Sequence, residues 1–387
     1  MTRKSTQKMI LMKVSLPMLA LAALVPLAAL NAADIPKSSN ALQVFKAKLQ
    51  TTVTGHLNQL LNADGSVVSL KGKTADGSEA MAFYLMFELT GEQKFRKAGI
   101  CLADQILKDM RGTTFGVLPI KEKEKPDGKT IIGGGPPALG EYAASVAYIL
   151  HKEGSRNDDL HYIANVLDRY PWNESGWWAA TIDVTTGEPK EPTAKPSPIN
   201  KTAAIAKAAG MISTYVREID PELSARLKHK ADTCIYSQVI PAQETDGFWH
   251  YSLSGNDPKD KDVLGYFMLT TRELMDLQKF NAAYRDEKLN AALRKAQAFA
   301  FTCIAPMTEP NTRATRPEHA TRGTPSHYTL KEDSKRSFQL GPILIGGGYM
   351  DEGTNIMNAA LDLFPFGDTG PAGAHAAEPS ALILSGF

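Results

Sequence analysis

Apolar positions along this 387-residue chain recur in pairs of helical stretches, and most pairs follow one another about every sixty residues. The first stretch of each pair is apolar and rich in small residues, as in "NKTAAIAKAAGMISTY", whereas the second carries charge along one face. Since small side chains permit close packing, we expect the first helix to be buried and the second to lie outside it. The first stretches begin near Ser78, Leu139, Asn200, Lys261 and Arg336.

A long period with two helices per unit is typical of stacked helical hairpins, which build either an open solenoid or a closed α/α barrel. With a preceding helix over residues 41–61, the chain has material for about six hairpins. Solenoid repeats usually have short links, but the links here are long and contain strand-like segments. They cover residues 111–138, 171–199, 240–260 and 304–335. We therefore predict an all-α fold, an α/α barrel (toroid) whose long loops and short β segments form its mouth.

The first residues have the order of a secretory signal peptide. Four basic residues precede an apolar run over 14–30, which ends in the small residues Ala32 and Ala33. The run is short and interrupted by proline, so a membrane anchor is the weaker alternative. We expect a signal peptide at 1–33, the barrel at 34–366 and a C-terminal tail at 367–387. The mature protein is then secreted or periplasmic, with no membrane segment.

Charge and motifs exclude several function classes. The chain has 43 Lys and Arg and 42 Asp and Glu, and loss of residues 1–33 would leave 39 basic against 42 acidic residues. A slightly acidic balance argues against a nucleic-acid partner. Three cysteines allow at most one disulfide. The sequence contains no HExxH, CxxC or GxSxG motif, so we expect neither a metal nor a cofactor.

If the inner helices begin at the mouth, their first residues share one cavity with the preceding links. Exposed aromatic faces stack on sugar rings, and basic side chains pair with carboxylates. The segment 313–327, "RATRPEHATRGTPSH", is a local basic patch, although a solvated loop would look the same. The candidate substrate-binding residues are Trp177, Trp178, Lys201, Trp249, Lys261, Arg316, His319 and His327.

The stretch "DGFWHYSL" at 246–253 is the most unusual of the links. On a strand, Phe248 and His250 would share one face, while Trp249 and Tyr251 would share the other. A histidine satisfied within the structure remains an alternative to a catalytic one. Asn200, at the start of a helix, is open to two interpretations as well: it can cap that helix or face the cavity.

The arrangement "DGFWHYSL…DVLGYFMLTTREL", a strand with aromatics and histidine followed by an inner helix, is similar to repeats in carbohydrate-active toroids, glycoside hydrolases and polysaccharide lyases alike. The residue types at the mouth favour a resemblance to the toroid polysaccharide lyases of alginate and glucuronan. These lyases neutralise the sugar carboxylate and remove the adjacent C5 proton. The resemblance implies that Asn200 and Arg322 neutralise the carboxylate and that His250 is the base or shares the neutralisation. Tyr251 or Tyr328 would then be acid or base. Such lyases often place Asn next to His, but Lys201 follows Asn200 here.

We therefore expect a secreted lyase that cleaves an anionic, uronic-acid-containing polysaccharide of the alginate or glucuronan type by β-elimination. Two alternatives stay open. An α/α-barrel glycoside hydrolase, including the unsaturated glucuronyl hydrolase type, would need a carboxylate pair. Its candidates are Glu79, Glu141, Asp246 and Asp262. The other alternative is a barrel that binds carbohydrate without catalysis.

Overall fold

The structure is a computed structural model in which residues 39–387 form one compact unit, described here by itself. Within the part of the chain that the structure describes, no helix is both long and apolar enough to cross a membrane. The expected signal peptide at 1–33 lies outside that part. The described residues are 40–68, 76–119, 121–124, 130–134, 136–189, 198–251, 264–304, 313–314, 328–329, 334–363 and 371–386.

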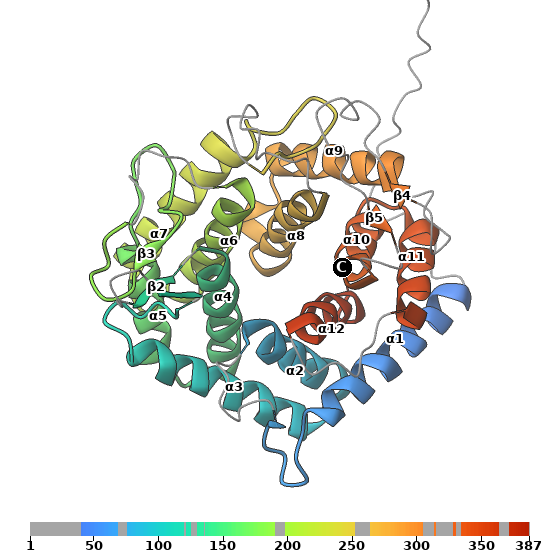
Figure 1. Ribbon diagram of the computed structural model, residues 1–387, viewed down its shortest axis with the longest axis horizontal. Coiled ribbons are helices and arrows are strands. Elements are labelled where there is room, and N and C mark those ends of the chain that lie inside the picture. The colour runs from blue at the N-terminus through green and yellow to red at the C-terminus, as the bar shows by residue number, and fades with distance from the viewer. Residues whose placement is uncertain are drawn as a thin grey trace, which may run out of the picture. The chain divides into compact units, whose positions relative to one another are not determined.

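Among the residues that the structure describes, six helices form a closed inner ring. Each packs on the next along the chain, and the last one packs on the first, so the ring has no open edge. Figure 1 shows the ring from one end, with α12 beside α2. The members are α2 (Gly77–Thr90), α4 (Pro136–Glu153), α6 (Ile199–Tyr215), α8 (Leu264–Phe280), α10 (Ser334–Gly346) and α12 (Pro371–Leu384).

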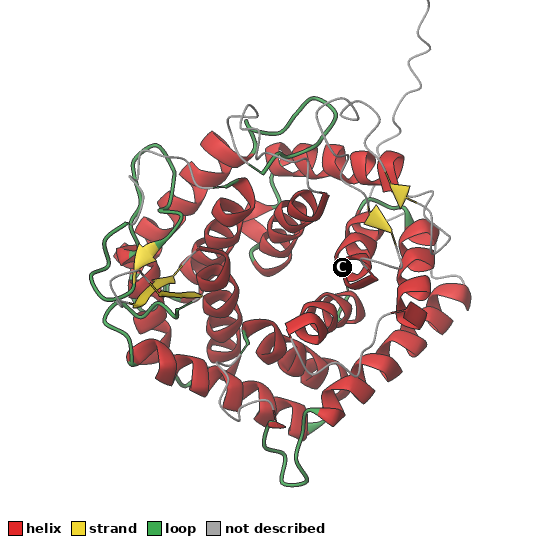
Figure 2. Ribbon diagram, viewed as in Figure 1, coloured by secondary structure: helices red, strands yellow, loops and turns green. Residues whose placement is uncertain are grey.

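In the described part of the chain, six further α-helices surround this ring, and each packs on one or more inner helices. Figure 2 shows that helices dominate the molecule, with a few short strands at the periphery. The expected all-α fold, an α/α barrel, is confirmed. The outer helices are α1 (Asn40–Gln59), α3 (Gln93–Arg111), α5 (Asn157–Arg169), α7 (Pro221–Cys234), α9 (Glu287–Ile304) and α11 (Met350–Leu363).

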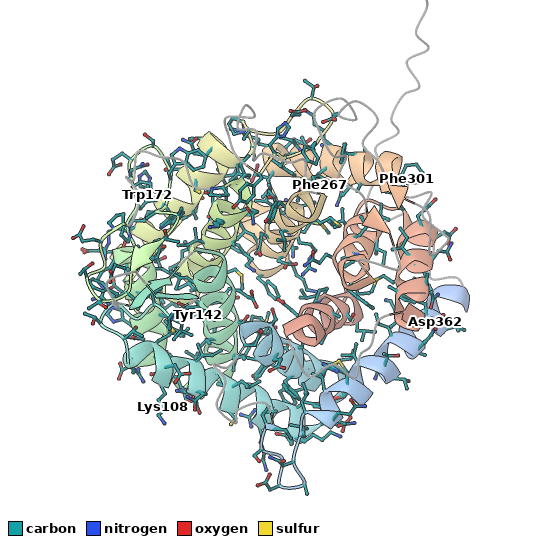
Figure 3. The ribbon with its side chains drawn as sticks, in the orientation of Figure 1. Lys108, Tyr142, Trp172, Phe267, Phe301 and Asp362 are labelled. Atoms are coloured by element: carbon teal, nitrogen blue, oxygen red, sulfur yellow. The ribbon has the colours of Figure 1, made fainter. Side chains whose placement is uncertain are left out.

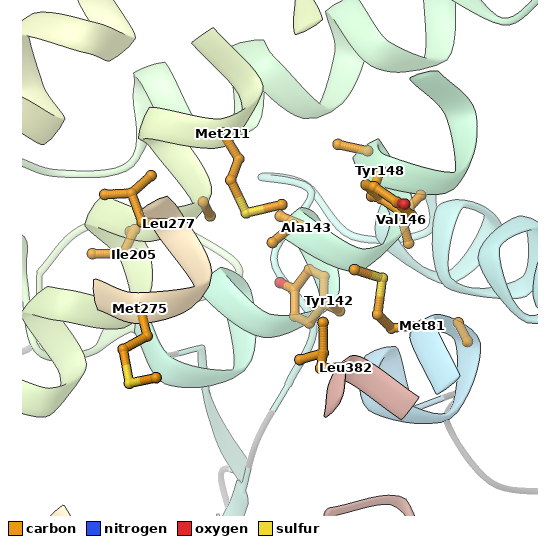
Figure 4. Close-up of a cluster of buried hydrophobic side chains, with 14 of the residues drawn as sticks. Met81, Tyr142, Ala143, Val146, Tyr148, Ile205, Met211, Met275, Leu277 and Leu382 are labelled. Atoms are coloured by element: carbon orange, nitrogen blue, oxygen red, sulfur yellow. The ribbon is translucent and has the colours of Figure 1, made fainter. Parts of the chain in front are cut away.

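Burial explains why each sequence stretch takes its place. Nearly every residue of α6 is buried, whereas α3 buries only one face, through apolar residues spaced three or four apart. Glycine lets inner helices approach closely. A Cβ at Gly140 would lie 2.5 Å from the carbonyl oxygen of Ala204, on the neighbouring helix. Figure 4 shows the apolar side chains of several inner helices, among them Met81, Met211 and Leu382, gathered in one cluster.

The last hairpin differs from the expectation. Residues 371–384, expected to belong to a tail outside the barrel, form α12 of the inner ring and pack on α2, α10 and α1. The first and last helices of the chain thus make up the sixth hairpin. Lys279 on α8 fixes the C-terminal end, since its Nζ donates to Leu382 O at 2.9 Å, Ser385 Oγ at 2.9 Å and Gly386 O at 2.6 Å.

The connections place the long links at one end of the barrel. Connections from an inner to the next outer helix are short, such as Gly91–Glu92 between α2 and α3. The long links all lead from an outer helix to the next inner one, so they share the end at which the inner helices start. Short strands occur in these links, antiparallel in the orders β1–β2–β3 and β4–β5. They are β1 (Lys121–Glu124), β2 (Thr130–Gly134), β3 (Ile182–Asp183), β4 (Arg313–Ala314) and β5 (Tyr328–Thr329).

Candidate active site

Charged side chains from several inner helices meet inside the ring. Helices α6 and α12 lie on opposite sides of it, yet Lys207 of α6 and Glu378 of α12 influence each other's ionisation. Their interaction must therefore cross the enclosed space. We call this group the lumen cluster, and within the described part of the chain it comprises Asp76, Ser78, Glu141, Lys207, Arg272, Glu273, Asp276 and Glu378.

Both cations of the lumen cluster are buried and already paired. Lys207 Nζ lies 2.5 Å from Glu273 Oε2, and Arg272 Nη2 donates to Asp276 Oδ2 at 3.0 Å, one helical turn further on. Burial alone would lower the pKa of Lys207, but the carboxylates of Glu273, Asp276 and Glu378 raise it above its ordinary value. Lys207 and Arg272 are each 6% exposed, so neither presents its charge to an incoming ligand.

Glu141 of α4 is a carboxyl with a strongly raised pKa in a partly accessible position. Burial raises its pKa to about 8, and Asp76 and Glu378 add to that, while Ser78 and Lys207 oppose it. At neutral pH this carboxyl therefore holds its proton. A protonated carboxyl in such a position can act as a general acid.

Ser78 connects Glu141 with a second carboxylate. Its hydroxyl donates to Glu141 Oε1 at 2.5 Å, and its backbone N–H donates to Asp76 Oδ1 at 2.8 Å. Asp76 is the N-cap of α2, which explains why its carboxylate is fixed at the start of an inner helix. Ser78 thereby brings a protonated carboxyl and a carboxylate to one place.

Glu378 is a third acid of the lumen cluster and keeps part of its surface accessible. Burial raises its pKa and Asp276 adds to this, while Lys207, Arg272 and a hydrogen bond with Ser78 counteract the shift. The net direction is upward, because two cations that each face their own carboxylate cannot fully compensate for burial.

His250, the expected base, lies in a turn that satisfies its side chain. Its Nε2 pairs with Glu244 Oε1, and its ring meets Phe248 edge-on at 5.3 Å between centroids. Glu244 N–H donates to Phe248 O at 2.9 Å, which closes the turn. Gly247 has φ +100°, and a Cβ there would lie 2.3 Å from Lys295 O, so the turn requires glycine.

The backbone of Tyr251 contacts the start of α6, one residue before Asn200. The carbonyl oxygen of Tyr251 accepts the N–H of Ile199 at 2.9 Å, while its ring lies 4.4 Å from that of Tyr266. The cap residue of α6 is Pro198, so of the two interpretations of Asn200 the helix cap does not apply. Asn200 is 6% exposed, and its Oδ1 has no hydrogen-bond partner among the described residues.

The expected aromatic sugar platforms are core residues. Trp178 and Trp249 have no exposed surface, and Trp177 is 5% exposed, so none of them offers a ring face to a sugar. Trp249 Nε1 donates to Val239 O at 2.8 Å, and Phe248 stacks on Phe267. Figure 3 shows Phe267 on inner helix α8. The expected alternation of strand faces is not observed in this link, since the adjacent side chains of Phe248 and Trp249 are both buried.

The other expected site residues fall into two groups: some lie on described elements, and the rest lie outside the described residues. Of Tyr328, only the backbone, in β5, is described. Lys201 is half-buried at the start of α6. Of the hydrolase candidates, Glu79 is buried on α2, and Asp246 accepts the N–H of Phe248 at 3.0 Å. The candidate residues of either hypothesis that lie outside the described residues are Lys261, Asp262, Arg316, His319, Arg322 and His327.

Sequence reasoning missed most of the lumen cluster. Lys207 stands alone in "TAAIAKAAGMI", and Glu378 in "GAHAAEPSALIL". A single charge in an otherwise apolar, small-residue helix is the signal that could have found them, since burying a charge needs a partner. In the described part of the chain, no group of three or more His, Cys, Asp or Glu is arranged to hold a metal ion.

Solved structures share this fold at low sequence identity. A mutant of a reducing-end-xylose releasing exo-oligoxylanase has a TM-score of 0.54 at 15% identity, over 90% of this chain and 96% of that chain. Such an enzyme complexed with xylose gives 0.54 at 13%, over 90% and 96%. A C. acetobutylicum glycoside hydrolase from family 105 gives 0.50 at 14%, over 71% and 79%. No protein-family model and no curated protein matches this chain. The likeness establishes the α/α-barrel fold.

Proposed function

We propose that this protein is a glycoside hydrolase in which Glu141 protonates the leaving oxygen of a glycosidic bond. One observation carries the proposal: Ser78 binds both Glu141, whose raised pKa keeps it protonated, and the carboxylate of Asp76. Glycoside hydrolysis needs a proton donor and a carboxylate beside the scissile bond. Glu378 also has a raised pKa and interacts with Ser78, so the choice of Glu141 as proton donor rests on its direct 2.5 Å hydrogen bond with the Ser78 hydroxyl.

In this mechanism the two carboxyls have separate roles. Glu141 donates its proton to the oxygen that leaves, and Asp76 removes a proton from the attacking water. Ser78 holds both groups, so their relative position does not depend on flexible side chains alone. Lys207 acts through charge, since it opposes a still higher pKa for Glu141.

The comparisons support hydrolysis over elimination. The solved structures that share the fold include an exo-oligoxylanase and a family 105 glycoside hydrolase. The lyase hypothesis relies on Arg322, outside the described residues, and on His250, which already pairs with Glu244. The alternative of a glycoside hydrolase, including one for unsaturated uronic-acid oligosaccharides, is therefore our preferred function. The order of residues 1–33 supports the further proposal that the protein is exported.

A substrate panel separates the hypotheses. The protein is incubated with neutral oligosaccharides and with oligosaccharides of alginate, glucuronan and pectin, while reducing ends and ultraviolet absorbance are followed. We expect new reducing ends without new absorbance, because hydrolysis creates no double bond. An unsaturated uronate substrate should lose its absorbance. A rise in absorbance on a uronate polymer would establish elimination. No change with any sugar would favour the alternative of a barrel that binds carbohydrate without catalysis.

A further inference from the structure

We propose that Asn200 is a substrate-binding residue whose Oδ1 accepts a hydrogen bond from a hydroxyl of the sugar unit next to Glu141, on the side of the mouth. The inference rests on the proposed function, since it positions one unit of the substrate of the same site. It concerns a single hydroxyl and leaves the charge of the sugar open.

The carboxamide of Asn200 is buried without a donor for its oxygen. Asn200 is 6% exposed, and no group among the described residues donates to its Oδ1. A buried carbonyl oxygen without a donor destabilises a folded protein, and the large majority of buried polar groups have a partner. A leucine of similar shape would avoid this cost, so folding alone does not explain an asparagine here. A ligand that supplies the missing donor does explain it.

Helix geometry directs Asn200 into the ring. Residues seven apart on an α-helix point in directions that differ by about 20°, so Asn200 lies on the same face of α6 as Lys207. Lys207 faces the enclosed space, since it interacts with Glu378 on the opposite side of the ring. Asn200 precedes it by two helical turns, at the end to which the long links lead. The start of α6 is fixed there, because Ile199 N–H donates to Tyr251 O at 2.9 Å.

The level of Asn200 along the ring places it about one sugar unit from Glu141. Gly140 is level with Ala204, because a Cβ at Gly140 would lie 2.5 Å from Ala204 O. Glu141 follows Gly140 directly, and Asn200 stands four residues before Ala204, which is about 6 Å nearer the mouth. This offset is similar to the length of one pyranose ring. A sugar whose glycosidic oxygen faces Glu141 therefore brings its own hydroxyls, or those of the adjoining unit, to the level of Asn200.

A sugar hydroxyl supplies what the oxygen of Asn200 lacks. A hydroxyl donates one proton, whereas an ionised carboxylate only accepts. A hydroxyl bound by Asn200 would hold its sugar unit in place while Glu141 transfers a proton to the leaving oxygen. Asn200 thus orients the substrate and takes no part in the proton transfer.

Thr202 on the same helix offers a matched control. Its Oγ1 is also buried without a partner, and Thr202 has no exposed surface. It points about 200° away from Asn200 around the helix, and its carbonyl oxygen lies 3.8 Å from Cys234 Sγ of the outer helix α7. Asn200→Leu and Thr202→Val each remove a buried polar atom that lacks a partner. Only Asn200 faces the enclosed space.

Titration calorimetry in the Glu141→Gln background measures the contribution of Asn200. The probes are xylotriose, cellotriose and trisaccharides of alginate, glucuronan and pectin. We expect at least one probe to bind, and adding Asn200→Leu to weaken that binding about three- to tenfold, as for one neutral hydrogen bond. Adding Thr202→Val should change it by less than about 1.5-fold, and neither change should lower Tm. Unchanged affinity with Asn200→Leu, an equal loss in both variants, or binding of no probe would overturn the inference.

Deoxy sugars test for direct contact. Monodeoxy forms of the probe that binds best are titrated into Glu141→Gln with and without Asn200→Leu. We expect the loss of one particular hydroxyl to weaken binding when Asn200 is present and to have no further effect once Asn200→Leu has removed its partner. Additive losses for every hydroxyl would contradict the proposed contact.

Turnover separates this inference from the proposed function. The unmodified protein and Asn200→Leu are compared on the same probes by release of reducing ends. Binding that depends on Asn200 without any hydrolysis would overturn the proposed function alone. Hydrolysis with an unchanged KM in Asn200→Leu would overturn the inference alone.

Discussion

The link over 240–251 and the lumen cluster both concentrate polar and aromatic side chains, but they satisfy them in opposite ways. In the link, His250 pairs with Glu244 six residues away, and Trp249 donates to Val239. In the lumen cluster, Lys207 and Glu378 come from opposite sides of the ring. Polar side chains that hydrogen-bond to residues nearby in the sequence stabilise a turn. Groups brought together from distant helices retain shifted pKa values and can do chemistry.

The sharpest test of this contrast compares one acid of the lumen cluster with the histidine of the link. We expect Glu141→Gln to lower kcat about 10²- to 10⁴-fold, because the amide cannot donate the catalytic proton. His250→Gln keeps a donor for Glu244 and should leave kcat within about twofold. The measurement is steady-state hydrolysis on a substrate found in the panel. The reverse order of effects would make the link the catalytic region.

The buried ion pair within α8 gives the next largest effect. Asp276→Leu leaves the Arg272 guanidinium unpaired in a buried position, so we expect the free energy of unfolding to fall by about 3–5 kcal/mol. Adding Arg272→Met to that variant removes the stranded charge and should restore most of the loss. Chemical denaturation of both variants provides the values. If the double variant were as unstable as the single one, the cost would come from packing and not from charge.

The raised pKa of Glu141 predicts a pH dependence of stability. The unfolded chain releases this proton near the ordinary value of 4.5, whereas the folded protein retains it up to about 8. Between these values the folded state binds more protons, so this group lowers stability as pH rises. Relative to Glu141→Gln, the unmodified protein should therefore lose Tm from pH 5 to pH 8. A constant difference in Tm across this window would show that the pKa is not raised.

The same ionisation should limit activity. Since a general acid must be protonated, we expect kcat to fall as pH rises above about 8. The pH profile of kcat between about 4 and 10, corrected for folded protein, measures this limb. A limb near the ordinary pKa of a glutamate would point to another acid.

The smallest effect concerns the closure of the ring. Lys279→Met removes three hydrogen bonds to the end of α12, so we expect a loss of about 1–3 kcal/mol in the free energy of unfolding. Hydrogen exchange should increase first in α12. The exposed Lys228, paired within α7, is the control, and Lys228→Met should cost no more than about 1 kcal/mol. Equal effects of the two changes would show that Lys279 does not hold the C-terminal helix.

The local pattern was enough to predict the hairpins. Runs such as "AAIAKAAGMI" are small and apolar on all sides, which suits a helix enclosed by neighbours. The pattern could not reveal α12, because "PAGAHAAEPSALIL" contains two prolines and little periodicity. This segment becomes helical as the sixth wall of the ring, where packing on α2 and α10 outweighs weak local preference.

The candidate site was predicted only in part. Glu141 was a candidate from its place early in an inner helix, but its partners were not. Asp76 and Glu378 are about 300 residues apart in the chain, so no spacing rule could connect them. Conversely, the concentration of aromatic residues in "DGFWHY" suggested a binding site. In the structure, the rings of Phe248 and Trp249 are buried and pack between the link and the neighbouring helices.

The repeating hairpins, the order of inner and outer helices and the charge balance follow from local periodicity and composition, which act over a few helical turns. The packing of distant segments is what makes α12 close the ring and brings carboxyls from the start of α2 and from α4, α8 and α12 together inside it. The pKa of a carboxyl depends on its neighbours in space and on lost water, and the folded ring alone sets both.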